Sequence, residues 1–206
     1  MSQKGPKNED FQTREYWDSR YEKEDGDFDW FKKYDEIRDI FLELIPSKQS
    51  RVLMLGCGNS TLSADMYADG YSNITNIDYS PVVIDKMRAR HPEMAWHVMD
   101  IRELKENSAA LGGLGTWDVI IDKGTMDALM AEKGSVWDPS PTVLKNVALE
   151  VDGVVELLKP KSGVFIYLTF AQKHFRQPHL ERPGLWEIET RTLGDMFHYY
   201  LFICRR

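Results

Sequence analysis

Two glycines and one acid have the types and spacing of a nucleoside-binding turn. The apolar run Val52–Leu55 stops at Gly56-Cys57-Gly58, and a second apolar run ends on Asp78, 20 residues after Gly58. Glycine tolerates the positive φ of a tight turn and lets a ligand approach the bare backbone. An acid at this distance can accept hydrogen bonds from ribose hydroxyls. The spacing therefore predicts a strand, turn, helix and second strand that together bind a nucleoside.

The residue at the third glycine position of this turn distinguishes between nucleotides. The pyrophosphate of a dinucleotide calls for Gly or Ala there, so that the helix packs closely and points its N-terminus at phosphate. In this chain the position holds Thr61, which is β-branched. S-adenosylmethionine has no phosphate and does not impose that demand. The turn therefore favours S-adenosylmethionine, with a dinucleotide or a turn that binds nothing as the alternatives.

Composition describes one ordinary globular domain. The 206 residues are 42% hydrophobic and 29% charged, which is enough for a complete core. The longest apolar run, Val164–Phe170, is too short to cross a bilayer, and a net charge of −7 argues against binding nucleic acid, so we expect neither partner. Cys57 and Cys204 have neither metal-site spacing nor a disulfide framework, as expected of reduced cysteines in a cytoplasmic protein.

The acids are concentrated near the start of the chain. The stretch Glu22–Asp29 holds five carboxylates and one lysine. One interpretation is a solvated acidic turn, and the other is a surface that attracts a basic protein substrate. Composition does not separate the two.

Apolar periodicity and turn residues predict alternating strands and helices after a disordered tail at residues 1–9. The expected helices are Phe11–Glu24, Tyr34–Ile45, Thr61–Asp69, Pro81–Arg90, Thr125–Ala131 and Val143–Leu158. The expected strands are Arg51–Leu55, Ile74–Ile77, Trp96–Met99, Trp117–Ile121, Val164–Phe170, Trp186–Thr192 and Phe197–Cys204. The segments Glu132–Pro141 and Ala171–Gly184 are expected to be loops, with His174, Arg176 and His179 on the surface.

Five β/α units followed by a terminal hairpin predict an α/β, Rossmann-like fold. We expect a single domain whose core spans residues 51–206 and contains a seven-stranded sheet, mostly parallel with one antiparallel strand near an edge. Residues 10–45 precede this core as a helical segment. Ligand should lie over the C-terminal ends of the early strands, where the strand order reverses.

With these elements in place, the chain resembles the class I S-adenosylmethionine-dependent methyltransferases over nearly its full length. The resemblance rests on Leu55-Gly56-Cys57-Gly58, Asp78, Met99-Asp100, Asp122 and Leu157-Leu158-Lys159-Pro160 with Gly163. Within that class it is similar to the methyltransferase-like 13 group, of the type that methylates lysine on translation elongation factor 1-alpha. This narrower similarity rests on Tyr16-Trp17-Asp18 with Arg20-Tyr21, on Asp29-Trp30-Phe31, on Asp78-Tyr79-Ser80 and on Asp122-Lys123-Gly124-Thr125.

The resemblance implies a cofactor role for ten residues. Gly56 and Gly58 would admit the methionine part, and Asp78 would accept from the ribose. Adenine would lie beside Tyr79 and Met99, with its amino group donating to Asp100. Trp17, Tyr21 and Trp30 would come from an N-terminal lid, residues 10–45, and their ring faces suit a sulfonium cation. Lys123 would contact the cofactor through its backbone or the stem of its side chain.

The resemblance also implies the reaction, which is methylation of a lysine on a basic protein of the elongation factor 1-alpha type. Asp122, at the end of the fourth expected strand, is the candidate catalytic residue and would orient the amine through its side chain or carbonyl. We expect no metal and a monomeric protein. A small-molecule methyltransferase and a non-catalytic cofactor-binding module are the alternatives.

Overall fold

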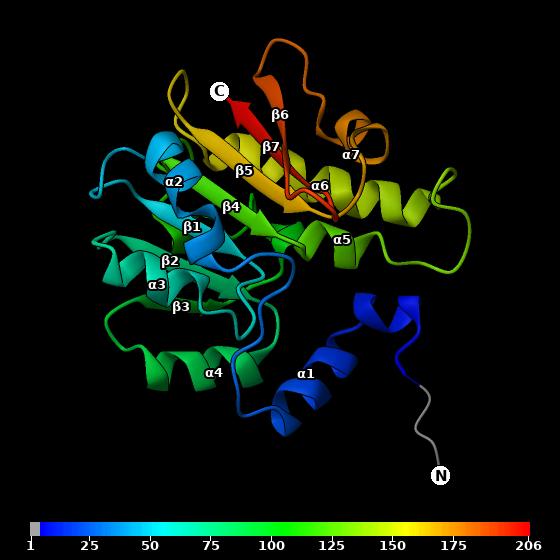
Figure 1. The fold of residues 1–206 in the computed structure, drawn as a ribbon, viewed down its shortest axis with the longest axis horizontal. Coiled ribbons are helices and arrows are strands. Elements are labelled where there is room, and N and C mark those ends of the chain that lie inside the picture. Colours follow the sequence, from blue (N-terminus) through cyan, green and yellow to red (C-terminus); the bar gives the residue numbers. More distant parts are fainter. Residues whose placement is uncertain (1–4) are drawn as a thin grey trace.

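A seven-stranded sheet organises the computed structural model, which describes residues 5–206 (Figure 1). The strand order is β3-β2-β1-β4-β5-β7-β6. The strands are β1 Val52–Leu55, β2 Ile74–Asp78, β3 Ala95–Val98, β4 Val119–Lys123, β5 Val164–Thr169, β6 Glu187–Leu193 and β7 Tyr199–Arg205. The first five are parallel, and β7 runs antiparallel between β5 and β6. This arrangement confirms the predicted fold class and the antiparallel pairing of the two closing strands.

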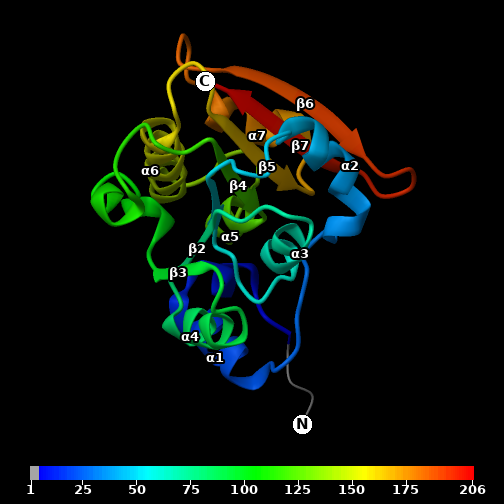
Figure 2. The same cartoon turned by 90° about the vertical axis from the view of Figure 1, so that its left-hand side faces the viewer.

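Helices cover both faces of the sheet (Figure 2). Because successive side chains of a strand point to opposite faces, Val52 and Met54 join one core cluster while Leu53 and Leu55 join the other. The first face is covered by α2 Tyr34–Leu44, α3 Leu62–Ala68 and α4 Pro81–Arg90. The second is covered by α5 Thr125–Leu129, α6 Pro141–Leu157 and α7 Lys173–Leu180. The 3-10 helices η2 Ile101–Glu103 and η3 Ser108–Leu111 complete the connections.

The local sequence explains where these helices begin. The side chain of Ser80 accepts from the backbone N–H of Val83, and Pro81 occupies the first turn of α4, as the Ser-Pro pair predicts. In α2, the buried Ile37 and Phe41 lie four residues apart on one face. No helix within residues 5–206 is both long enough and apolar enough to cross a bilayer.

The N-terminal segment lies beyond the C-terminal ends of the parallel strands (Figures 1 and 2). It contains the 3-10 helix η1 Asn8–Gln12 and α1 Arg14–Lys23, and then continues without regular structure to α2. Helix α2 belongs to the core layer, so the cover over the site is shorter than the predicted lid and consists of residues 8–33. Of the predicted tail, residues 1–4 lie outside the described part of the chain, and residues 8 and 9 begin η1.

The expected loop at 171–184 is instead interrupted by a helix, α7. Its internal Pro178 and its many polar residues conceal the helical pattern in the sequence. The prediction of a surface position for Arg176 is also wrong, because this side chain is buried and pairs with Asp127 at 2.8 Å.

Candidate active site

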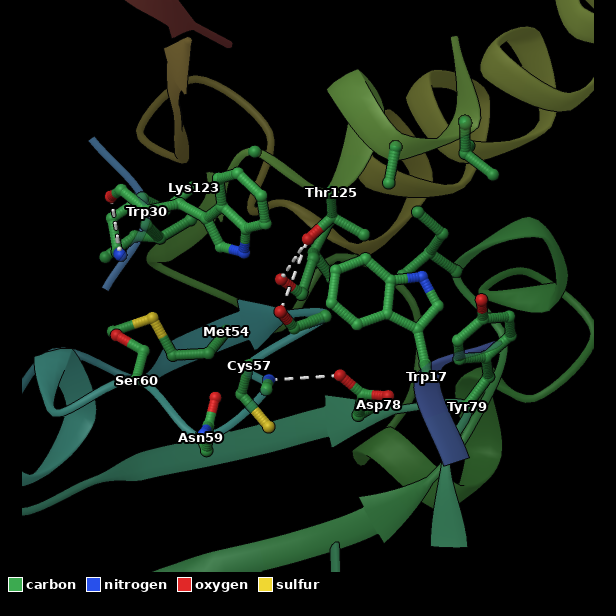
Figure 3. A pocket seen from close by; sticks show the side chains of 18 of the residues that line it. Trp17, Trp30, Met54, Cys57, Asn59, Ser60, Asp78, Tyr79, Lys123 and Thr125 are labelled. Atoms are coloured by element: carbon green, nitrogen blue, oxygen red, sulfur yellow. Dashed lines mark hydrogen bonds between the residues drawn. The ribbon is translucent and has the colours of Figure 1, made fainter. Parts of the chain in front are cut away.

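A cavity opens at the C-terminal ends of the parallel strands, under the N-terminal cover (Figure 3). Its lining is mostly apolar with a few polar groups, as is typical of a small-molecule site. All ten residues with predicted cofactor roles line it, namely Trp17, Tyr21, Trp30, Gly56, Gly58, Asp78, Tyr79, Met99, Asp100 and Lys123. The structure therefore brings together residues that are spread over about half of the chain.

The glycine turn follows β1, and its shape depends on two contacts. Gly56 and Gly58 have φ of +53° and +52°, values at which a side chain is strained. A Cβ on Gly56 would lie 2.3 Å from Oγ1 of Thr125, and one on Gly58 would lie 2.9 Å from the Tyr21 hydroxyl. Thr125 also donates to the carbonyl of Leu55 at 3.0 Å. The turn is thus held against α5 on one side and the N-terminal cover on the other.

Asp78 ends β2 and supports this turn. Its carboxylate accepts from the backbone N–H of Gly58 at 3.0 Å and from that of Ser80 at 2.9 Å. The residue is only 5% exposed, and burial raises the pKa of its carboxyl to about 6, although both backbone donors oppose the rise. A buried carboxylate at the wall of a cavity, with accepting capacity left over, suits a pair of ribose hydroxyls.

Residues that follow β3 form another part of the cavity wall. Asp100 accepts from the backbone N–H of Arg102 at 2.9 Å and also receives the Arg102 guanidinium. Burial raises the pKa of Asp100, but the hydrogen bonds from Arg102 outweigh it and hold the carboxyl below its usual value. Tyr79 and Met99 line the cavity beside this pair. The carboxylate lies at the cavity wall, where an adenine amino group could reach it, and Arg102 already donates to both of its oxygens.

Aromatic rings from the N-terminal segment roof the cavity. Trp17 stacks on Tyr21 with 5.7 Å between ring centroids, and its indole N–H donates to the carbonyl of Phe11 at 2.8 Å. Trp30 meets Trp17 edge to face at 6.5 Å, and the Arg20 guanidinium lies outside them. This cover makes the cavity apolar on the side where a sulfonium would lie.

Lys123 directs its charge away from the cavity. Its ammonium pairs with the Asp29 carboxylate at 2.9 Å and donates to the carbonyl of Trp30 at 3.0 Å. Burial lowers the pKa of Lys123, and Asp29 offsets part of that shift. Only the stem of Lys123 and its backbone therefore remain for the cofactor, and the ammonium is paired with Asp29.

Asp29 also binds the glycine turn. Its carboxylate accepts from the Ser60 hydroxyl and from the N–H and hydroxyl of Thr61. Burial raises its pKa, but Lys123 and these donors hold it below the ordinary value. One buried carboxylate thus joins the cover to the ends of both β1 and β4.

Asp122 is placed differently from its predicted role. It is fully buried outside the cavity lining, and its carboxylate accepts from the backbone N–H groups of Thr125 and Met126 at 2.8 and 2.9 Å. Burial raises its pKa to about 6, and burial together with Asp122 raises the pKa of the facing Glu150. The carboxylate caps α5, and Asp122 is not among the residues that line the cavity. An orienting role through its carbonyl stays a prediction.

Sequence reasoning missed several residues that shape the cavity. Gln12 and Phe11 line it from η1, Thr125 from α5, and Asp29 supports it from behind. Asp29 belongs to a recognised motif, but its neighbours Ser60 and Lys123 are 31 and 94 residues away in the chain. No spacing rule connects positions that meet only after folding.

The features of the cavity fit S-adenosylmethionine. Two left-handed glycines leave room for the amino-acid part, two acids can accept from ribose and adenine, and aromatic faces attract a sulfonium. The open turn with a β-branched third position is inconsistent with a close pyrophosphate contact. Fold and site together define a class I S-adenosylmethionine-dependent methyltransferase.

Comparison with known proteins agrees with this class. Residues 46–181 match the family described as methyltransferase domain. EEF1A lysine methyltransferase 4 of Mus musculus is 35% identical over 207 residues, which cover 97% of this chain and 78% of that protein. The eEF1A lysine and N-terminal methyltransferase of Mus musculus is 31% identical over 196 residues, covering 91% of this chain and 26% of that protein. The chain therefore belongs to the methyltransferase-domain family and, within it, to the family of EEF1A lysine methyltransferase 4.

A solved structure shows the same fold at greater distance. The N-methyltransferase NodS from Bradyrhizobium japonicum WM9, in complex with S-adenosyl-l-homocysteine, superposes with a TM-score of 0.63 at 17% sequence identity. The match covers 96% of this chain and 98% of that one. At this identity the likeness supports the architecture alone.

Proposed function

We propose that this methyltransferase methylates the ε-amine of a lysine on a protein of the elongation factor 1-alpha type. The observation that carries the proposal is the 35% identity to EEF1A lysine methyltransferase 4 over 97% of the chain. The apolar roof over the cavity supports it, because an amine must be neutral to react and an apolar surrounding disfavours the ammonium.

The chemistry places few demands on the protein. S-adenosylmethionine supplies, when bound, a methyl group on a positively charged sulfur. The lysine nitrogen uses its lone pair to form the new N–C bond, the C–S bond breaks, and that electron pair stays on sulfur. Alignment of the nitrogen with the methyl group can then supply much of the rate.

The proton must leave the lysine before the reaction, and no side-chain base is needed. Among the lining residues that the structure describes, the carboxylates are Asp78 and Asp100, and both have predicted roles toward the nucleoside. The amine therefore loses its proton to water before it enters. The residues around the acceptor bind, orient and exclude water, and the carbonyl of Asp122 stays a candidate for that orientation.

The proposal also covers the kind of partner protein, the compartment and the oligomeric state. A net charge of −7 suits a basic protein, and two free cysteines suit the cytoplasm, with the enzyme acting as a monomer. The acidic stretch contributes less to this attraction than the sequence suggested. Asp25 and Asp27 pair with Lys86 and Arg90 of α4, and Asp29 is buried.

A labelling experiment tests the proposal. The protein is incubated with isotopically labelled S-adenosylmethionine and either purified elongation factor 1-alpha or a cell lysate, and products are assigned by mass spectrometry. We expect label on a lysine of elongation factor 1-alpha and much less of it with Asp78→Ala when S-adenosylmethionine is below saturation. Label confined to small molecules would overturn the protein substrate and support a small-molecule methyltransferase. Tight cofactor binding without any labelled product would support the non-catalytic module.

A further inference from the structure

Phe11 and Gln12 of η1 and Ala128 and Leu129 of α5 line the cavity and have no cofactor role. With Trp30, whose ring meets that of Phe11, they form one end of the cavity. This end lies next to the end of β4, because α5 follows that strand directly. Helix η1 closes it by docking on α5.

Aromatic rings form the walls of this end. Trp30 meets Phe11 at 6.1 Å with an interplanar angle of 87°, and it meets Trp17 at 6.5 Å and 72°. Phe11 and Trp17 are 5.9 Å apart and tilted by 46°. Because these three rings are steeply inclined to one another, both ring faces and ring edges border this end of the cavity. Ring faces attract amines and methylated ammonium groups. An aliphatic side chain that ends in nitrogen is complementary to such walls.

Gln12 brings a neutral amide to the same end of the cavity. The Gln12 side chain donates from Nε2 to the carbonyl of Leu129 at 2.8 Å. Because a carbonyl can only accept, this contact fixes the amide orientation and identifies the free atom as Oε1. Among residues 5–206, no group donates to that oxygen.

We propose that this end is the acceptor subsite, in which the Gln12 amide oxygen accepts a hydrogen bond from the lysine ε-amine between the aromatic walls. The subsite rests on the proposed lysine substrate. A neutral oxygen suits the step because a carboxylate would hold the amine as ammonium, which has no lone pair. Gln12 takes up no proton and acts by aligning the nitrogen.

Two substitutions separate orientation of the amine from a structural role. Gln12→Met and Gln12→Glu both lose the Nε2 donor to Leu129, and only Gln12→Glu keeps an oxygen for the amine. We expect Gln12→Met to lower kcat/KM about tenfold, as for one lost hydrogen bond. Gln12→Glu should retain more activity and move the pH profile to higher pH, because the carboxylate raises the pKa of the lysine. Equal losses without a pH shift would overturn the subsite and leave Gln12 a purely structural residue.

Binding measurements provide a readout that does not depend on turnover. Calorimetry should give both variants the wild-type affinity for S-adenosylhomocysteine, which also shows that they fold. Elongation factor 1-alpha should bind the S-adenosylhomocysteine complex of Gln12→Met several-fold more weakly than the wild-type complex. The exposed Gln49→Met is the matched control and should change neither value.

The outcomes distinguish the subsite from the proposed function. If the wild-type protein labels no protein lysine, the function itself is overturned. If it labels lysine and both Gln12 variants match it in rate, pH profile and binding, only the subsite is overturned. Trp30→Leu should weaken acceptor binding as well, measured at saturating S-adenosylhomocysteine because Trp30 also has a predicted cofactor role.

Discussion

The two halves of the cavity are held in place by different kinds of contact. The nucleoside half is built from the ends of β1, β2 and β3, and the core on both sides of the sheet fixes these strands. The cover of residues 8–33 adds no strand to this sheet and is attached through side chains, of which Trp17 and Tyr21 pack into one core cluster. Asp29 is buried against Lys123, Gln12 donates to Leu129, and Asp25 pairs with Lys86.

This difference predicts different dynamics for the two halves. A strand end cannot move without disturbing the sheet, whereas a segment outside the sheet can open locally without breaking strand pairs, at a lower free energy. We therefore expect the cover to open for cofactor exchange while the sheet stays folded. Bound cofactor should reduce that opening, because it fills the space between the two halves.

The largest expected effect comes from removing the charge that holds the cover. Asp29→Asn leaves Lys123 buried without a counter-ion, and breaking a buried pair in this way costs about 3–5 kcal/mol. Opening the cover relieves that cost by exposing Lys123 to water. Hydrogen exchange should therefore accelerate across residues 8–33 and stay unchanged in β1 and β4. The exposed Glu22→Gln, also in the cover, is the control, and acceleration throughout the sheet would contradict a separate opening of the cover.

Glycine substitutions test the rigid half. Gly56→Ala combines a left-handed φ with a clash against Thr125, which together cost about 2–5 kcal/mol in the free energy of unfolding. Gly26→Ala in the cover has no atom within 4 Å of the new Cβ and should stay within about 0.5 kcal/mol. Denaturant unfolding measures both. Similar losses at the two positions would show that turn and cover are equally constrained.

The ribose role of Asp78 predicts the next largest effect. Hydrogen bonds to a charged group are worth about 1.5–3 kcal/mol, so Asp78→Ala should weaken S-adenosylmethionine binding about 10- to 150-fold. Calorimetry measures the dissociation constant, with exposed Asp85→Ala as the control. Wild-type affinity in Asp78→Ala would remove the ribose role.

The pKa of Asp78 adds a pH dependence to cofactor binding. Burial raises that pKa from 3.8 to about 6, so the carboxyl of the cofactor-free protein becomes protonated as pH falls below about 6. Ribose hydroxyls donate to the carboxylate, so affinity should fall by up to about tenfold per pH unit below this value. Asp78→Asn should remove the dependence. If the affinity of the wild-type protein for the cofactor does not change between pH 5 and pH 7, this prediction is wrong.

The smallest expected effect concerns the exposed acids of the cover. Asp25 and Asp27 form surface ion pairs, which are typically worth about 0–1 kcal/mol. Replacing both by Asn should raise KM for elongation factor 1-alpha by at most about fivefold, leave kcat unchanged and reduce the salt dependence of KM. Asp29 is left out of this test because it is buried. A changed kcat would show that these acids also hold the cover.

Most of the nucleoside half could be predicted from the sequence. Gly56, Gly58 and Asp78 stand at the spacing of one strand, turn and helix, and this spacing is a local property of the chain. The acceptor half could not be predicted in this way. The segments expected as loops at 132–141 and 171–184 supply no residue to the cavity lining, whereas Gln12 and Phe11 do. Their partners on α5 are more than 100 residues away, as the Gln12–Leu129 hydrogen bond shows.

By itself, the sequence determined the α/β class, the strands, the glycine turn and the acid that follows it, because hydrophobic periodicity and turn chemistry act over short distances. Only the tertiary structure decided the direction of the charged side chains. Lys123 turns to Asp29 and away from the cavity, and Asp122 turns inward to cap α5. Burial requires each of these groups to find a partner, and the available partners depend on which distant segments meet.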